Sequence, residues 1–236
     1  MSLKNVQQRL INIGYSLGPA GADGEWGKFT EAAINGVLDH VLAHGEPPPV
    51  PTAGAKRYKR LIAEADLPPV AMKRVHIHWT AGAYVASELD KEHYHFVVEG
   101  DSDVIPGDHS IRDNVNIKGK TSDDYAAHTL GANTGAIGVS MCCMAGAVEG
   151  LTNGKFPMLE KQFETMTHVV AQLADRYNIT VTDKTILTHA EVQTNLGIKQ
   201  RGKWDITVLP FKPDLKGAKP VGDYIRERVS ALLLPA

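Results

Sequence analysis

Residues 74–79 read Arg-Val-His-Ile-His-Trp, a run in which polar and apolar side chains alternate. Successive side chains of a β-strand point to opposite faces, so alternation with a period of two predicts a strand. In that strand His76 and His78 share one face, and the Thr-Ala-Gly of residues 80–82 follows its end. A histidine therefore stands at a strand end, from which a side chain can reach a cleft.

Further strands and helices are predicted around this stretch. Short apolar runs at residues 95–99, 136–141 and 185–188 indicate three more strands. Residues 159–178 carry an apolar stripe at helical spacing, and residues 56–65 favour a shorter lead-in helix. Because helices and strands alternate, we expect an α/β fold with a mixed central sheet flanked by helices.

The first 45 residues predict a small all-helical domain in front of that fold. One helix ends before Gly14, a second covers residues 28–44, and the loop at residues 15–27 contains four glycines and a proline. Such a loop can turn tightly, because glycine tolerates positive φ and proline fixes φ. A plain helical hairpin is the simpler interpretation of the same residues.

The motifs of this segment resemble the peptidoglycan-binding module that many wall hydrolases carry. They are Val-Gln-x-x-Leu at residues 6–10, Gly-Tyr-x-Leu-Gly-Pro-Ala-Gly-x-Asp-Gly-x-x-Gly at residues 14–27 and Thr-x-x-Ala at residues 30–33. The resemblance implies that this segment binds peptidoglycan.

A proline-rich stretch separates this segment from the rest of the chain. Residues 46–51 read Glu-Pro-Pro-Pro-Val-Pro, which favours an extended polyproline conformation. We therefore expect a helical domain at residues 1–45, a stiff linker at residues 46–53 and a larger domain at residues 54–236.

Composition excludes several classes of partner. Of the 236 residues 43% are apolar, and 25 basic against 27 acidic residues give a net charge of −2. Such a chain can bury an ordinary core, but it has no general attraction for nucleic acid or an anionic membrane.

The start of the chain lacks the apolar stretch of a secretory leader, and no apolar run is long enough to insert into a membrane. We expect a protein that is cytoplasmic when made, with Cys142 and Cys143 as buried thiols.

Two histidines and an aspartate stand at the ends of predicted strands or motifs. His78 closes the first strand, His189 follows the strand at residues 185–188, and Asp205 closes Gly-Lys-Trp-Asp. Two imidazoles and one carboxylate suit a catalytic Zn²⁺ whose fourth position stays open. The residues alone also fit hydrogen-bonded core histidines and a surface aspartate.

Five blocks of residues resemble, in the same order, type 2 N-acetylmuramoyl-L-alanine amidases. The likeness is greatest to their phage lysozyme-amidase branch, which shares its fold with the animal peptidoglycan recognition proteins. The blocks are His-x-Thr-Ala-Gly (78–82), Tyr-His-Phe-Val-Val (94–98), Ala-His-Thr-Leu-Gly-x-Asn-x-x-x-Ile-Gly-Val (127–139), Thr-His-Ala-Glu-Val (188–192) and Lys-x-Asp (203–205).

The resemblance implies a role for six residues, and a seventh lies next to one of them. The family's zinc ligands fall on His78, His189 and Asp205, its catalytic tyrosine on Tyr94 and its basic residue on Lys203. His128 matches a position that faces the substrate, although a structural hydrogen bond is an equal alternative. Trp79, next to a ligand, is expected to border the substrate cleft.

The chain departs from the family pattern at two places. Many relatives carry a glutamate where this chain has Ser140, so a glutamate base is not expected here. The loop before Asp205 is longer than in most relatives, which leaves Asp183 and Asp214 as substitute ligands. His76 competes with His78, although the Thr-Ala-Gly that follows favours His78.

We therefore expect a zinc-dependent peptidoglycan hydrolase that cuts the amide between N-acetylmuramic acid and L-alanine. The absence of a leader suggests a monomeric phage or prophage endolysin, released through a lesion made by a separate membrane-permeabilising protein. The first alternative is a recognition protein that binds peptidoglycan without cutting it. A second is hydrolysis of another bond, within the stem peptide or in an anhydro-sugar recycling substrate.

Overall fold

The computed structural model describes residues 2–12, 15, 17, 21–44 and 56–234. Contacts divide the chain into two compact units, residues 1–58 with 227–236 and residues 59–226. The linker expected at residues 46–53 lies outside the described residues, and the domain bounds 1–45 and 54–236 stay predictions. In the described part of the chain no helix combines the length and apolarity needed to cross a membrane.

Two helices form the N-terminal part of the first unit, among the residues that the structure describes. They are α1 (Leu3–Asn12) and α2 (Lys28–His44), which confirms the predicted helical segment. Leu10, Leu17 and Ala33 form their common core. The side chain of Gln7 organises the loop between the helices, because its amide nitrogen donates to Asp23 Oδ1 at 2.9 Å and its oxygen accepts from the amide of Gly24 at 2.7 Å.

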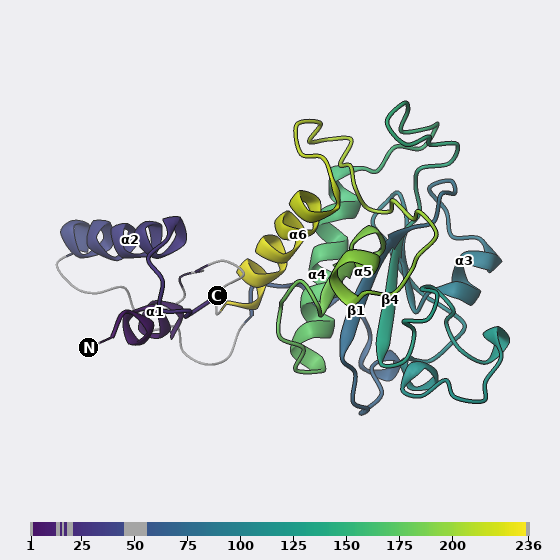
Figure 1. Cartoon of the computed structure of the whole chain (residues 1–236), viewed down its shortest axis with the longest axis horizontal. Helices are drawn as coiled ribbons and strands as arrows, with labels where there is room; N and C mark the ends of the chain where they lie inside the picture. Colours follow the sequence, from purple (N-terminus) through teal and green to yellow (C-terminus); the bar gives the residue numbers. More distant parts are fainter. Residues whose placement is uncertain (1, 13–14, 16, 18–20, 45–55, 235–236) are drawn as a thin grey trace. The chain divides into compact units, whose positions relative to one another are not determined.

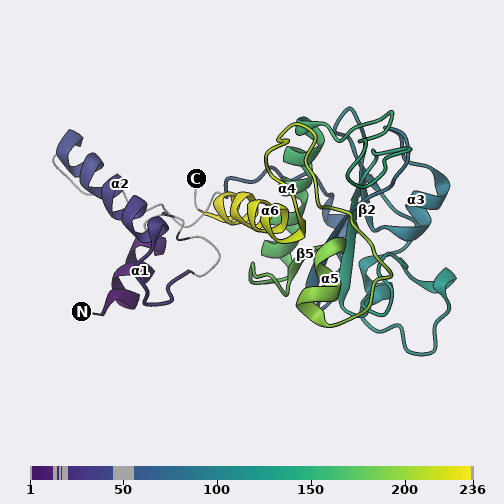
Figure 2. The ribbon, with the colours of Figure 1, turned by 45° about the horizontal axis from the view of Figure 1, so that its top comes forward.

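A five-stranded mixed sheet forms the centre of the second unit (Figures 1 and 2). Its strands, in spatial order, are β3 (Val104–Pro106), β2 (Phe96–Val98), β4 (Ala136–Met141), β1 (Arg74–Trp79) and β5 (Ile186–Thr188). All neighbours are parallel except β3, which pairs antiparallel with β2. The expected mixed sheet is confirmed, and β3 is the strand that the sequence patterns missed.

Helices cover the sheet on both sides (Figures 1 and 2). They are α3 (Glu88–His93), α4 (Glu160–Arg176), α5 (His189–Leu196) and α6 (Ala218–Leu233). The long helix α4 packs against β4, β1 and β2, and its Phe163 ring stacks on Tyr224 of α6 with centroids 5.6 Å apart. Cys142 and Cys143, just after β4, are buried free thiols, as expected.

The prediction of a lead-in helix at residues 56–65 is wrong. The structure has only a short 3₁₀ turn there, Glu64–Asp66. The backbone before the turn is bound by the amide of Gln172 on α4, which accepts from the N–H of Leu61 at 2.8 Å and of Ile62 at 2.9 Å and donates to the Ile62 carbonyl at 2.8 Å. A tertiary partner thus replaces the helix's own hydrogen bonds.

The two faces of β1 differ in chemistry. Val75 and Ile77 are fully buried and point away from the face that carries His76 and His78. In the parallel register Gly138 of β4 lies beside His76, and Ser140 lies beside His78. The histidine face is therefore a buried polar layer within the fold.

A glycine makes room for one more ring on this face. The imidazole of His128 lies over Gly138, where an added Cβ would stand 2.6 Å from two of its ring atoms. Its centroid is 5.5 Å from that of His76, 5.3 Å from that of His78 and 5.8 Å from that of His95. The missing side chain at Gly138 thus lets four imidazoles pack together.

A buried ion pair joins α5 to α6. Arg226 donates to Glu191 Oε1 at 2.8 Å and Oε2 at 3.1 Å, and both side chains are at most 2% exposed. Glu191 also accepts from the N–H of Thr188 at 3.0 Å, so it caps the start of α5. The pair holds the helix that begins at His189.

We predict that Arg226→Met lowers the free energy of unfolding by about 3–5 kcal/mol, because it leaves the Glu191 carboxylate buried without its partner. Urea unfolding followed by fluorescence measures the loss. The double variant Glu191→Gln with Arg226→Met should recover much of it, since it removes the uncompensated charge. An Arg226→Met protein as stable as the parent would contradict this role for the pair.

Candidate functional site

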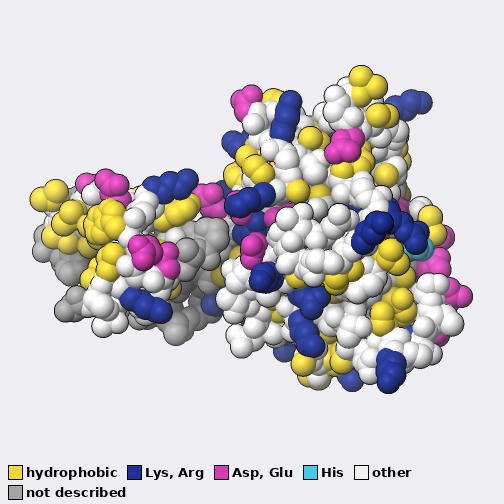
Figure 3. Space-filling view, in the orientation of Figure 1, with side chains coloured by type: hydrophobic (Ala, Val, Ile, Leu, Met, Phe, Trp, Pro, Cys, Tyr) yellow, Lys and Arg dark blue, Asp and Glu magenta, His cyan; other side chains and the backbone are white. Residues whose placement is uncertain are grey.

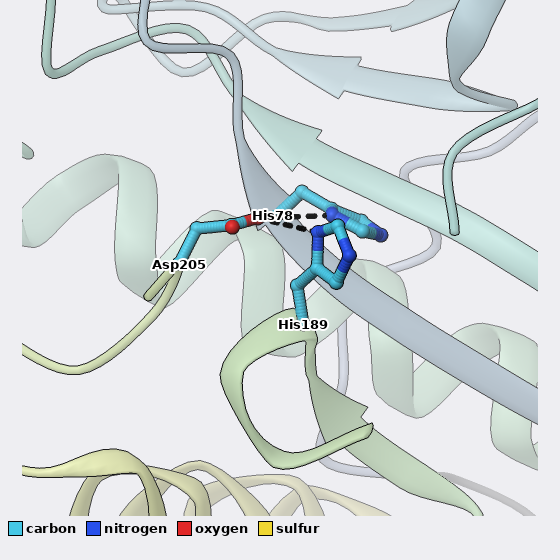
Figure 4. A group of neighbouring side chains, drawn as sticks. All are labelled: His78, His189 and Asp205. Carbon is cyan, nitrogen blue, oxygen red and sulfur yellow. Dashed lines mark hydrogen bonds and ion pairs between the residues drawn. The ribbon is translucent and has the colours of Figure 1, made fainter. Parts of the chain in front are cut away.

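Three side chains converge where β1 and β5 end (Figure 4). Nδ1 of His78 lies 3.0 Å and Nδ1 of His189 lies 3.1 Å from the same carboxylate oxygen, Oδ2 of Asp205. Within the described ranges these residues are the single group of three or more His, Cys, Asp or Glu side chains that could hold a metal ion. All three are buried.

The fold places these residues by three local devices. β1 lies between β4 and β5 in parallel, so His78 on β1 and His189 after β5 emerge at the same edge of the sheet. The capping of Thr188 by Glu191 starts α5 at His189. The amide of Ala190 donates to the carbonyl of Asp205 at 2.7 Å, which ties the loop that carries the aspartate to the same helix.

Burial sets the charge of this group. Desolvation lowers the pKa of His78 to about 4, although the hydrogen bond that His78 donates to Asp205 opposes the change. Burial also disfavours ionised Asp205, but hydrogen bonds from His189 and His78 outweigh it and lower the pKa of the carboxyl to about 2. At neutral pH the site thus combines a neutral His78 imidazole with an ionised carboxylate, the forms in which these side chains bind a metal ion.

The outer nitrogens of both histidines have partners of their own. His189 Nε2 lies 2.9 Å from Oε1 of Gln200, and Gln200 Nε2 donates to the carbonyl of Leu130 at 2.8 Å. His78 Nε2 lies 3.3 Å from Oγ1 of Thr129. Partners of this kind orient imidazole ligands.

These ligand atoms fit a zinc ion. A tetrahedral zinc with bonds of about 2.0–2.2 Å holds its ligand atoms roughly 3.3 Å apart, close to the separations from Asp205 found here. Two nitrogens and one oxygen are borderline ligands that zinc accepts, and three protein ligands leave a position for substrate or water.

A cleft of about 710 Å³ opens beside the three side chains. Its lining includes the other residues that the sequence predicted for the site, Trp79, Tyr94, His128 and Lys203, together with His189 and Asp205. Trp79 packs edge to face against Trp204 with centroids 4.7 Å apart. The structure thus gathers six of the seven predicted residues along the cleft, and the seventh, His78, is fully buried and hydrogen-bonded to Asp205.

Tyr94 and Lys203 differ in their surroundings. The Tyr94 ring lies 5.2 Å from the His78 ring. Burial, helped by the charge of Asp205, raises the pKa of Tyr94, so its hydroxyl keeps its proton at neutral pH. The side chain of Lys203 is exposed on the cleft wall. Ser140 stands beside His78 in the sheet, and its buried hydroxyl interacts with the Tyr94 hydroxyl, which opposes the rise of the Tyr94 pKa.

The competing ligands are not part of the group. Asp183 and Asp214 are exposed, and neither belongs to the convergent set. His76 turns its Nδ1 to Oγ1 of Thr129 at 3.1 Å instead.

Thr129 and Gln200 are the site residues that sequence reasoning missed. Thr129 stands directly after His128 in the Ala-His-Thr block, a hint that was available. Gln200 belongs to no motif.

We predict that the metal-free protein loses stability as the pH falls below 6.5. In the unfolded chain each histidine binds its proton near the ordinary pKa of 6.5, whereas burial lowers the folded pKa of His78 to about 4 and of His95 to about 3. The unfolded chain therefore binds more protons in this window, and the free energy of unfolding falls by about 1.4 kcal/mol per pH unit for each such imidazole. Urea unfolding at about pH 7 and about pH 5 measures the slope. Equal stability at both values would contradict the burial of neutral imidazoles.

Comparisons with known proteins identify a family for the segment that carries these residues. Residues 68–205 match the Amidase_2 family model, described as N-acetylmuramoyl-L-alanine amidase. None of the curated proteins matches the chain significantly.

Solved structures give distant matches. The structure of PlyL is 18% identical, with a TM-score of 0.34 and coverage of 63% of this chain and 84% of that one. A complex of tracheal cytotoxin with the ectodomains of the peptidoglycan recognition proteins LCa and LCx is 21% identical, with a TM-score of 0.34 and coverage of 58% and 79%. The endolysin amidase LysCS from Clostridium intestinale URNW is 14% identical, with a TM-score of 0.34 and coverage of 56% and 91%.

The family model spans more than half of the chain and ends at Asp205, so it contains all seven residues of the site. The chain belongs to the N-acetylmuramoyl-L-alanine amidase family.

Proposed function

We propose that this protein is a zinc-dependent hydrolase that cuts the amide between N-acetylmuramic acid and the L-alanine of peptidoglycan. The observation that carries the proposal is the meeting of His78 Nδ1, His189 Nδ1 and Asp205 Oδ2 beside a cleft, within the segment that matches the amidase family. These three residues would hold the ion, which when bound activates water and polarises the scissile carbonyl.

The residues of the cleft wall supply the rest of the chemistry. Charge develops on the carbonyl oxygen as the amide is attacked, and Lys203 and the protonated Tyr94 are the donors available to stabilise it. The leaving amine needs a proton, and the Tyr94 hydroxyl is the candidate, since the Tyr94 ring lies 5.2 Å from the ring of His78. Ser140 occupies the place of the glutamate found in many relatives, so no carboxylate base is assigned there.

Aromatic and imidazole side chains line the cleft. Trp79 lines it beside the metal ligands, and His128 lines it from the loop that crosses the sheet. We assign contacts with the sugar or the stem peptide to these two residues. For the α1–α2 unit we propose binding of the same polymer, which is the role that its resemblance to the wall-binding module implies.

Hydrolysis of peptidoglycan would lyse a bacterial cell. We propose a monomeric phage or prophage endolysin that reaches the wall after a separate protein permeabilises the membrane. The specific alternative is a recognition protein that binds peptidoglycan without cutting it. The presence of His78, His189 and Asp205, with Tyr94 and Lys203, favours the enzyme.

Digestion of purified peptidoglycan tests this proposal. Cleavage should release new free amino groups of L-alanine without new reducing sugars, and a chelator should stop it until zinc is added back. Wall binding without new amino groups, even with zinc, would instead identify a recognition protein. New reducing sugars would identify cleavage of the glycan.

We predict that His78→Ala and His189→Ala abolish this digestion, because each removes a ligand of the proposed ion. Asp214→Asn, which changes an exposed carboxylate outside the group, serves as the matched control and should digest like the parent. Circular dichroism checks that each variant is folded. Full activity of either folded histidine variant would exclude the proposed ligand set.

We further predict that Tyr94→Phe lowers kcat by about 10²–10³-fold with a smaller change in KM, because the lost hydroxyl acts on charge that develops in the transition state. The rate of amino-group release over a range of peptidoglycan concentrations separates the two constants. An unchanged kcat would remove Tyr94 from the catalytic residues.

A further inference from the structure

One hydroxyl group on the histidine face contacts three imidazole rings. Oγ1 of Thr129 lies 2.8 Å from Nδ1 of His128, 3.1 Å from Nδ1 of His76 and 3.3 Å from Nε2 of His78. The side chain is buried, and its own backbone N–H donates to Oδ1 of Asn133 at 2.8 Å. The hydroxyl is therefore held at a fixed point between the three rings.

The number of protons at this point is limited. A threonine hydroxyl has one hydrogen to donate and two lone pairs to accept, and a neutral imidazole has one N–H and one bare nitrogen. The single hydroxyl hydrogen of Thr129 can point at only one of the three ring nitrogens at a time. Two of the three ring nitrogens must therefore donate to Oγ1, and the third must accept from it.

Without a metal ion, one assignment of donors and acceptors satisfies all three contacts of the Thr129 hydroxyl. His78 Nδ1 faces the Asp205 carboxylate at 3.0 Å, and a carboxylate only accepts, so the proton of His78 is on Nδ1. Its bare Nε2 then accepts the hydroxyl hydrogen of Thr129. His76 and His128 must both donate to Thr129 from Nδ1.

A bound zinc ion would change this assignment of donors and acceptors. As a ligand, His78 must offer the bare Nδ1, so its proton moves to Nε2, which becomes a donor to Thr129. The hydroxyl hydrogen then turns to His76 or His128, and that ring must carry its own proton on Nε2. Among His76, His78 and His128 no proton is gained or lost, and two of these rings exchange the nitrogen that is protonated. The proton on Nδ1 of His189, which faces the same carboxylate, must leave that nitrogen separately.

We propose that Thr129 is a positioning residue that couples the tautomer of the metal ligand His78 to those of His76 and His128. Its hydroxyl can donate or accept, so it satisfies Nε2 of His78 both with and without the ion. The inference rests on the proposed zinc site. It explains why a hydroxyl group, and not a fixed donor or a fixed acceptor, stands between these rings.

Zinc affinity of substituted proteins tests the role of the hydroxyl. Thr129→Val keeps the shape but offers no acceptor for Nε2–H of His78, and we expect zinc affinity to fall by about 10–100-fold. Thr129→Ser keeps the hydroxyl and should bind zinc within about threefold of the parent. Thr167→Val, a buried threonine on α4 that bonds within its own helix, is the matched control. Competition with a chromophoric chelator measures each affinity.

The nitrogen-15 NMR signals of the histidine rings give a second readout on the unsubstituted protein. His95 is an internal reference, because its Nδ1 accepts from the N–H of Gly138 at 2.9 Å and its proton must stay on Nε2. On adding zinc, His78 and one of His76 and His128 should move their proton from Nδ1 to Nε2. Ring signals that show His78 alone changing would overturn the coupling.

The possible failures can be told apart. If the parent protein binds no zinc, both the proposed function and this inference fall. If the parent binds zinc and Thr129→Val binds it equally well, only the inference falls. Should Thr129→Val not fold, the Thr129→Ser affinity and the NMR signals of the parent still decide the matter.

Discussion

The fold around the site depends on a carboxylate buried among imidazoles. An isolated ionised aspartate is costly to bury, yet Asp205 is held at one oxygen by the Nδ1 atoms of His78 and His189. The hydrogen bonds outweigh the desolvation and keep the carboxylate ionised. The three elements that carry these residues, β1, α5 and the loop before Asp205, must therefore meet at one point for the group to be stable.

Other hydrogen bonds and an ion pair hold the side chains of His78 and His189 in place around Asp205. The Glu191–Arg226 pair fixes the start of α5, Gln200 holds the outer nitrogen of His189, and Thr129 holds that of His78. The apolar side of the sheet is covered by α4, whose Phe163 packs on α6. On the face drawn in Figure 3, described Lys and Arg side chains are scattered among acidic and apolar ones without a continuous basic stripe. That face therefore offers no continuous basic surface for a polyanion.

The sequence predicted the centre of the fold better than its edges. β1 and β4 begin and end where alternation and apolar runs placed them, because both strands are buried and their patterns are strong. The lead-in helix failed because Gln172, more than a hundred residues away, binds that backbone. α5 was missed as a helix although Thr188 and Glu191 have the spacing of a capping box, a signal that could have found it.

The residues of the site also fall into those that the sequence predicted and those that it did not. Six of the seven predicted residues line the cleft, and the buried His78 contacts Asp205 from β1, which lies beside β5 in the parallel sheet. Thr129 and Gln200 act through hydrogen bonds to rings from other parts of the chain, and no local pattern records such contacts.

Anomalous X-ray diffraction from crystals of the zinc-loaded protein, measured on both sides of the zinc absorption edge, tests the central claim most directly. The account predicts one strong peak per chain, about 2.0–2.2 Å from His78 Nδ1, His189 Nδ1 and a carboxylate oxygen of Asp205. A peak at other residues, or no peak in crystals grown with zinc, would contradict it.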